Sequence, residues 1–150
     1  MTQTFTTHSA EETREVGRNF ARTLKPGTLV CFEGNLGAGK TTFIQGLLEG
    51  LGAEKPFVSP TFILMKQYDL TMPTESGIKY IYHADAYRLG APEFREIGFE
   101  EWISDPDGVT LLEWPKRIAE LLPEKRIEIS LRTLSENERE ISVESIGEPV

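Results

Sequence analysis

The sequence predicts an α/β fold with three layers, in which helices flank both faces of a mixed, mainly parallel sheet. A strand-like run at residues 28–33 leads through a glycine-rich loop into a helical period at residues 40–51. Further strand-like runs alternate with helical segments along the rest of the chain. Two of those runs, 62–70 and 78–83, are joined by a short polar turn, which indicates an antiparallel pair within the sheet.

The elements of the first half have recognisable ends. Ser9, with Glu12 three residues later, has the spacing of a capping box and predicts the start of a helix. One apolar stripe follows, made of Val16, Phe20 and Leu24. The Lys-Pro-Gly run at 25–27 ends this helix, because proline cannot continue it. Gly52 stands where the cap of the helix at 40–51 belongs.

The second half alternates strands with short helices. Pro115 suits the first turn of a helix, and residues 146–150 are expected to fray. The predicted elements are strands at 62–70, 78–83, 109–112, 126–131 and 140–145 and helices at 92–98 and 115–121.

Composition limits the classes of function. The chain has 150 residues, which predicts a single domain over 1–150. Lys and Arg number 16 against 24 Asp and Glu, a formal net charge of −8, which argues against direct binding of DNA or other nucleic acid. We expect a cytoplasmic protein without membrane contact, since no long apolar run and no secretory signal is visible. Cys31, the single cysteine, lies in a strand-like run and is interpreted as a buried core residue.

Residues 34–41 read Gly-Asn-Leu-Gly-Ala-Gly-Lys-Thr and match G-x-x-x-x-G-K-[ST] at every fixed position. Glycines let successive N–H groups turn inward around an anion, and the next helix points its positive end at the phosphates. Lys40 would reach the β- and γ-phosphates, and Thr41 would offer its hydroxyl to Mg²⁺. Thr42 is a residue of the first helical turn that could also touch a phosphate. A simple glycine turn is much less consistent with this strand–loop–helix context, so we predict a P-loop NTPase-like fold.

Two acidic residues end strands and are candidates for the Mg²⁺ site. Glu113 follows the apolar run at 109–112, and Asp85 ends the strand-like run IYHAD at 81–85. One carboxylate could bind the metal directly and the other through water. The alternative for either is a helix cap or an ion pair with Arg88. Thr61 could swing onto the metal or the γ-phosphate, or be an ordinary residue at the start of a strand; the spacing leaves both open.

The remaining candidates near these acids have ordinary explanations. Arg88 could neutralise charge in phosphoryl transfer or form a surface ion pair. His83 is interpreted as a strand-end residue only. Trp114 is more often a core residue than a ligand contact.

The ordered set of motifs resembles one family. Residues 33–43 (EGNLGAGKTTF), 59–62 (SPTF), 83–89 (HADAYRL) and 112–115 (LEWP) are similar to those of TsaE, the bacterial P-loop ATPase subunit needed to make threonylcarbamoyladenosine in tRNA. The resemblance covers most of the chain, from the helix at Ser9 to the strand at Arg126.

The resemblance implies roles for individual residues. ATP phosphates would be held by Leu36, Gly37, Ala38, Gly39, Lys40, Thr41 and Thr42, with Trp114 also at the site. Thr41 and Glu113 would hold Mg²⁺. Thr61 would belong to a switch-like loop, and Asp85 would be required for hydrolysis. Phe5 and Thr7 would lie near the adenine.

The resemblance also implies partners. The family works with TsaB and TsaD, and the threonylcarbamoyl group is transferred on TsaD. The chain would therefore meet tRNA only indirectly, through that complex, which agrees with its acidity.

Other functions share the phosphate loop. A small-molecule or nucleotide kinase needs an acceptor site and usually an arginine-rich lid, but the longest candidate lid, residues 70–78, holds no arginine. A GTP-binding switch would be expected to carry an N-K-x-D segment, which is absent. A non-catalytic ATP sensor has no need of the two acids Asp85 and Glu113.

Overall fold

The computed structural model describes residues 2–35 and 37–147. In chain order the elements are β1 (Thr2–Thr7), α1 (Ala10–Ala21), β2 (Leu29–Glu33), α2 (Lys40–Leu51), β3 (Met65–Asp69), β4 (Tyr80–Asp85), α3 (Ala91–Glu96), α4 (Phe99–Ser104), β5 (Gly108–Glu113), the 3₁₀ helix η1 (Pro115–Leu121), β6 (Arg126–Thr133) and β7 (Arg139–Ile146). No helix within the described residues is both long and apolar enough to cross a membrane.

The strands form one mixed sheet in the order β1-β7-β6-β2-β5-β4-β3. The central strands β6, β2, β5 and β4 pair in parallel, while β7 and β3 run against their neighbours. The prediction of a mixed, mainly parallel sheet is therefore confirmed. Because β2, β4 and β5 are parallel, their carboxyl ends meet at one edge, where ligands bind in open α/β sheets.

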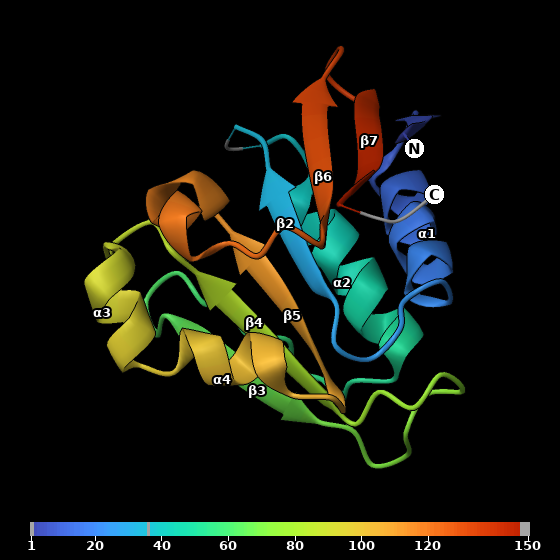
Figure 1. Ribbon diagram of the computed structural model, residues 1–150. Helices are drawn as coiled ribbons and strands as arrows, with labels where there is room; N and C mark the ends of the chain where they lie inside the picture. Colours follow the sequence, from blue (N-terminus) through green and yellow to red (C-terminus); the bar gives the residue numbers. More distant parts are fainter. Residues whose placement is uncertain (1, 36, 148–150) are drawn as a thin grey trace.

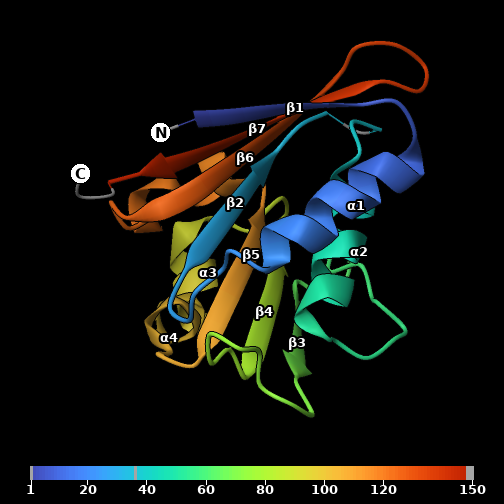
Figure 2. The same ribbon diagram turned by 90° about the vertical axis from the view of Figure 1, so that its right-hand side faces the viewer.

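Helices cover both faces of this sheet, which confirms the three layers (Figures 1 and 2). Helices α1 and α2 lie on one face, over a core that includes Phe32, Leu111 and Ile129. Helices α3, α4 and η1 lie on the other, over Cys31, Ala84 and Leu112. Adjacent residues of one strand belong to different cores, because side chains alternate along a strand.

Three glycines allow α1 and α2 to approach each other closely. A Cβ atom at Gly17 would collide with the Phe43 carbonyl oxygen, and one at Gly46 would collide with the Arg14 carbonyl oxygen. A Cβ at Gly50 would lie 2.8 Å from another carbonyl oxygen, that of Arg18. Any side chain at these positions would force the two helices apart, and α2 carries the phosphate loop at its amino end.

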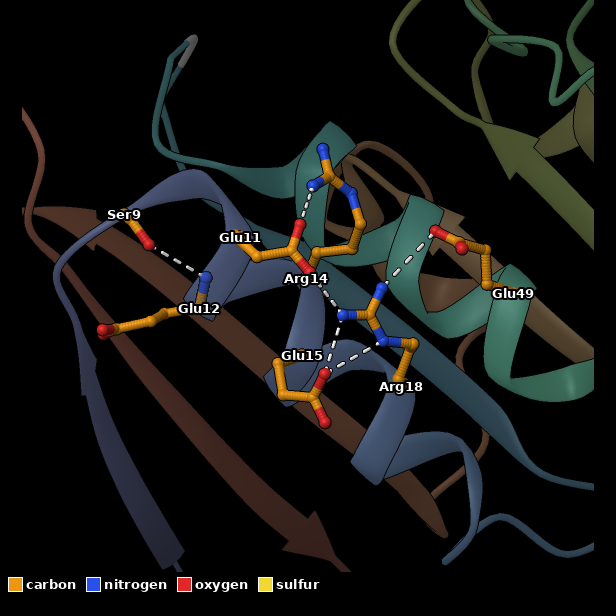
Figure 3. Close-up of polar contacts among 7 residues, drawn as sticks. All are labelled: Ser9, Glu11, Glu12, Arg14, Glu15, Arg18 and Glu49. Atoms are coloured by element: carbon orange, nitrogen blue, oxygen red, sulfur yellow. Dashed lines mark hydrogen bonds and ion pairs between the residues drawn. The ribbon is translucent and has the colours of Figure 1, made fainter.

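Charged side chains connect successive turns of α1 and reach α2 (Figure 3). The Arg18 guanidinium contacts carboxylate oxygens of Glu11 and Glu15 at 2.6 and 2.7 Å, and lies 3.7 Å from that of Glu49 on α2. Arg14 donates to Glu11 at 2.7 Å. Hydrogen bonds from Arg18 and Arg14 lower the pKa of Glu11 below its ordinary value.

The predicted cap of α1 is confirmed with one difference. The Ser9 hydroxyl accepts a hydrogen bond from the Glu12 amide at 3.1 Å. The Glu12 carboxylate accepts from the backbone N–H of His8, one residue before the expected donor, at 2.8 Å. This backbone hydrogen bond is the main cause that lowers the pKa of Glu12. The helix ends at Ala21, earlier than the run at 25–27 suggested.

Several predicted elements are wrong in extent. Residues 62–64 form a turn and not the start of a strand, so that β3 begins at Met65. The chain turns there because the Pro60 carbonyl accepts from the Leu64 amide at 2.7 Å, and Leu64 has a φ of 72°. The single helix predicted at 92–98 is α3, followed after Gly98 (φ 111°) by the unpredicted α4.

Strand β1 was not predicted, because it lies at the edge of the sheet. All of its residues except Thr7 are exposed, so the sequence carries no apolar alternation there. Of the tail expected to fray, Ile146 still belongs to β7 and Gly147 follows it in a bend, whereas 148–150 lie outside the described residues. The expected core position of Cys31 is confirmed, and burial raises the pKa of its thiol to about 12.

Candidate functional site

The loop between β2 and α2 has the conformation that its glycines predict. Gly37 and Gly39 have φ values of 83° and 99°, which L side chains rarely adopt. A Cβ atom at Gly34 would lie 2.8 Å from the Leu131 carbonyl oxygen, so only glycine fits there. The turn is closed by a hydrogen bond from the Ala38 amide to the Asn35 carbonyl at 3.0 Å. Leu36, expected to contribute to phosphate binding, lies outside the described residues.

The loop leads directly into α2, whose first turn faces a cavity. Gly39 is the N-cap, and no side chain of the described residues caps this helix end. The first amide groups of a helix have no partners within it, so they can bind an anion. Lys40, Thr41 and Thr42 occupy this first turn, and all three line the cavity.

This cavity has a volume of about 550 Å³, within the range of ligand pockets. It brings together nearly all of the predicted site residues, from the loop, the turn at 59–61 and the ends of β4 and β5. The lining includes Gly37, Gly39, Lys40, Thr41, Thr42, Thr61, Asp85, Glu113 and Trp114. Among the predicted site residues that the structure describes, Ala38 is the exception, because its side chain is buried in the core beneath the loop.

Lys40 is the buried cation of the cavity. Its side chain runs over Trp114, with Nζ 4.1 Å from the ring centroid. No carboxylate of the described residues pairs with it, although the residue is only 7% exposed. A buried cation without a counter-charge is costly, and an anionic ligand would neutralise it.

Trp114 is held in an unusual backbone conformation. Its φ of 59° is left-handed, and it follows the last residue of β5. The ring packs against Tyr87, with 5.0 Å between the ring centroids. The sequence alone suggested a core residue, but the structure places Trp114 in the cavity wall.

The two acids lie side by side at the edge of the sheet. Asp85 and Glu113 are register partners in the adjacent parallel strands β4 and β5. Asp85 accepts from the Tyr87 amide at 2.8 Å and from the Thr61 hydroxyl at 3.3 Å. The suggested ion pair with Arg88 is not formed, since the Arg88 guanidinium lies 4.6 Å from the Phe62 ring centroid instead.

The turn at 59–61 brings two hydroxyls to the cavity, and that of Thr61 contacts Asp85. Ser59 and Thr61 share a hydrogen bond of 3.0 Å between their hydroxyl oxygens. Of the two possibilities for Thr61, the structure does not place it in a strand. It lies in a turn against Asp85, near enough to the phosphate loop to line the same cavity.

The sequence did not reveal several other residues of the site. His83 contacts the Glu113 carboxylate, with 2.9 Å between Nε2 and Oε2. The start of α1 and the β6–β7 hairpin also line the cavity, through Ser9, Ala10, Thr13, Glu136, Asn137 and Arg139. Only the cap motif at Ser9 hinted at a helix end here, since the hairpin comes close solely through strand pairing. Phe5 lines a second cavity at the opposite edge of the sheet, and Thr7 is buried against Thr13. Their expected position near the adenine stays a prediction.

The residues present fit a nucleoside triphosphate with Mg²⁺. The loop glycines, the uncapped end of α2 and the buried Lys40 suit phosphate oxygens. The Thr41 hydroxyl and the carboxylates of Asp85 and Glu113 are hard oxygen donors, which Mg²⁺ prefers. The fold and this loop together define a P-loop type of nucleotide-binding protein.

Comparison with known proteins gives the family. A model of the family described as "Threonylcarbamoyl adenosine biosynthesis protein TsaE" matches residues 7–141. The chain belongs to the TsaE family.

Individual relatives agree with this assignment. The chain is 38% identical to the "tRNA threonylcarbamoyladenosine biosynthesis protein TsaE" of Bacillus subtilis over 141 residues, 94% of this chain and 84% of the relative. It is 41% identical to the Treponema pallidum protein of the same name over 136 residues, 90% of this chain and 95% of the relative. The crystal structure of Bacillus subtilis YdiB superposes with a TM-score of 0.80 and 33% identity, covering 98% of this chain and 87% of YdiB.

Proposed function

We propose that this chain is a Mg²⁺-dependent ATPase that serves the formation of threonylcarbamoyladenosine in tRNA. The main observation behind this proposal is that one cavity joins described residues of the phosphate loop to the paired acids Asp85 and Glu113. The names of the related proteins support the pathway. The cytoplasm, where tRNA is modified, is the proposed location.

In this proposal the loop residues 36–42 and the Lys40 ammonium bind the phosphates. Thr41 and Glu113 hold the Mg²⁺, which when bound would neutralise charge on the phosphate oxygens. Asp85, accepting from the Thr61 hydroxyl, orients the turn at 59–61 towards the phosphates. Trp114 keeps Lys40 extended across the cavity.

Hydrolysis is proposed to act through partner proteins of the TsaB and TsaD type. A net charge of −8 disfavours direct contact with tRNA, which would be bound by the complex. Slow turnover by the chain alone, accelerated by the partners, is the expected behaviour.

A kinase is the second candidate, and the structure gives it little support. The segment 70–78, considered as a lid, joins the far ends of β3 and β4. Its Thr71 hydroxyl donates to Glu54 and its Ser76 hydroxyl to the Leu24 carbonyl, each at 2.9 Å. None of its residues lines the cavity. The segment therefore cannot exclude water from the proposed site without a large rearrangement.

Glu113→Gln tests the proposal, because it removes one negative charge and keeps the shape. We expect ATP turnover, measured as phosphate release with the partners present, to fall by about 100-fold or more, since metal stabilisation of the transition state is worth several kcal/mol. Glu120→Gln, an exposed acid of η1 outside the cavity, is the control. Undiminished turnover in a folded Glu113→Gln protein would contradict the proposal, and rapid phosphate transfer to a metabolite would favour the kinase.

A further inference from the structure

His83 is a buried histidine that contacts one of the two acids of the site. It lies on β4 with only 4% of its surface exposed. Its side chain is on the same face of β4 as Asp85, two residues further on, because side chains alternate along a strand. Its Nε2 lies 2.9 Å from Glu113 Oε2 on the neighbouring strand, and the Glu113 side chain is only 13% exposed.

The hydrogen bond fixes which ring nitrogen carries a proton. An ionised carboxylate can only accept, so Nε2–H must donate to Glu113. Nδ1, the other ring nitrogen, is buried and has no partner among the described residues. Leaving a buried polar atom unpaired costs free energy, so an apolar side chain would suit this position better if packing alone mattered.

This hydrogen bond restrains the Glu113 carboxylate. With Oε2 held by the imidazole, the Glu113 group is restrained in rotation, and Oε1 is the oxygen left for other ligands. Mg²⁺ demands near-ideal octahedral geometry, so a ligand whose direction is fixed in advance loses less freedom on binding. Hydrogen-bonded partners of metal ligands elsewhere contribute about 10- to 100-fold to metal affinity.

We propose that His83 is a positioning residue that orients Glu113 for the Mg²⁺ of the bound nucleotide. This inference rests on the proposed function, because it presupposes a Mg²⁺–nucleotide complex at Glu113. His83 itself touches neither metal nor nucleotide in this assignment.

The test uses three substitutions that differ in what they can donate. In His83→Gln the side-chain amide nitrogen is as many bonds from Cα as Nε2 is, so it can still reach Glu113. In His83→Asn the same amide is one bond too short. His83→Leu has no donor. Thr110→Val is the matched control, because Thr110 on β5 is also buried with an unpaired side-chain atom, but its hydroxyl makes no hydrogen bond to Glu113.

The measured quantity is the affinity for a fluorescent ATP analogue, with Mg²⁺ and with a chelator, and urea unfolding reports the fold of each variant. We expect His83→Leu and His83→Asn to reduce the gain in affinity due to Mg²⁺ by about 10-fold or more. Affinity in the chelator should stay unchanged. His83→Gln and Thr110→Val should keep most of the gain.

The outcomes separate the two proposals. If the wild type does not bind the analogue, the proposed function fails. If the wild type gains affinity from Mg²⁺, but the Gln and Asn substitutions behave alike, the inference about His83 is overturned and the proposed function stands. The comparison of Gln with Asn decides the matter even where His83→Leu does not fold.

Discussion

At the level of single residues, Lys40 combines burial with a charge that no described carboxylate neutralises. Its ammonium group lies above the Trp114 ring, in the cavity that the phosphate loop lines. An aromatic ring stabilises a desolvated cation by about 2 kcal/mol or more. The ring carries no net charge to neutralise the ammonium group, which therefore remains available to a phosphate.

Lys40→Ala tests this role. We expect the affinity for ATP, measured by calorimetric titration, to fall by about 10- to 100-fold, because hydrogen bonds to charged groups contribute about 1.5–3 kcal/mol. Lys79→Ala is the control, since this half-exposed lysine stands at the other edge of the sheet. Equal affinities of both variants and the wild type would show that Lys40 does not bind phosphate.

The Cys31 thiol should behave as a core group. Burial raises its pKa to about 12, and the thiolate is the reactive form. At pH 8 we expect almost no reaction with a thiol reagent in the folded protein and rapid reaction of one thiol per chain in denaturant. Rapid labelling of the folded protein would contradict the structure.

The same shift gives a dependence of stability on pH. The folded state retains the proton of Cys31 to a higher pH than the unfolded chain, in which the pKa of a cysteine thiol is about 8.5. Its contribution to folding stability is therefore complete below that pH. The contribution is lost as the pH rises towards about 12.

The site residues differ in how far the sequence could predict them. Lys40, Thr41 and the loop glycines are neighbours in the chain, so one motif finds them together. The contact between His83 and Glu113 depends on the pairing register of β4 with β5, which no local pattern encodes. His83 was therefore interpreted as an ordinary strand residue.

At the level of elements, the phosphate loop is carried by α2, and α2 is fixed by its close contact with α1. Gly17, Gly46 and Gly50 let the two helix backbones approach so closely that no side chain would fit between them. Ser9, which caps α1, lines the same cavity as the loop. The helix pair therefore sets the distance between two walls of the site.

Gly46→Ala should destabilise the protein. In an isolated helix the change would stabilise by about 1 kcal/mol. Here the new Cβ would collide with the Arg14 backbone, which cannot rotate away as a side chain can. We expect a net loss of about 1–3 kcal/mol in the free energy of unfolding from urea denaturation, while Gln45→Ala on the same helix changes little. An unchanged or higher midpoint would contradict the close helix contact.

Elements with strong periodicity were predicted well, and weak ones were not. The boundaries of α2 and its cap at Gly52 follow from the apolar stripe and the glycine. Strand β1 buries almost nothing and therefore shows no pattern. The turn at 62–64 carries exposed Phe62 and Ile63, and these apolar residues imitate the start of a strand.

For the whole molecule, the parallel centre of the sheet explains why distant segments meet. The carboxyl ends of β2, β4 and β5 deliver the loop, Asp85 and Glu113 to one edge. On one side of this centre, β7 pairs antiparallel with β6, and the hairpin between them forms a further wall of the cavity. The strand order that creates this arrangement could not be read from the sequence, although the presence of the elements could.

The most direct test of the Mg²⁺–nucleotide site is a crystal structure with a non-hydrolysable ATP analogue and Mg²⁺. We predict the phosphates against residues 37–42 with Lys40 beside them. The Mg²⁺ should lie about 2.0–2.1 Å from the Thr41 hydroxyl, with Glu113 binding it directly or through one water. An analogue bound elsewhere, or a Mg²⁺ that neither Thr41 nor Glu113 approaches, would contradict the proposed site.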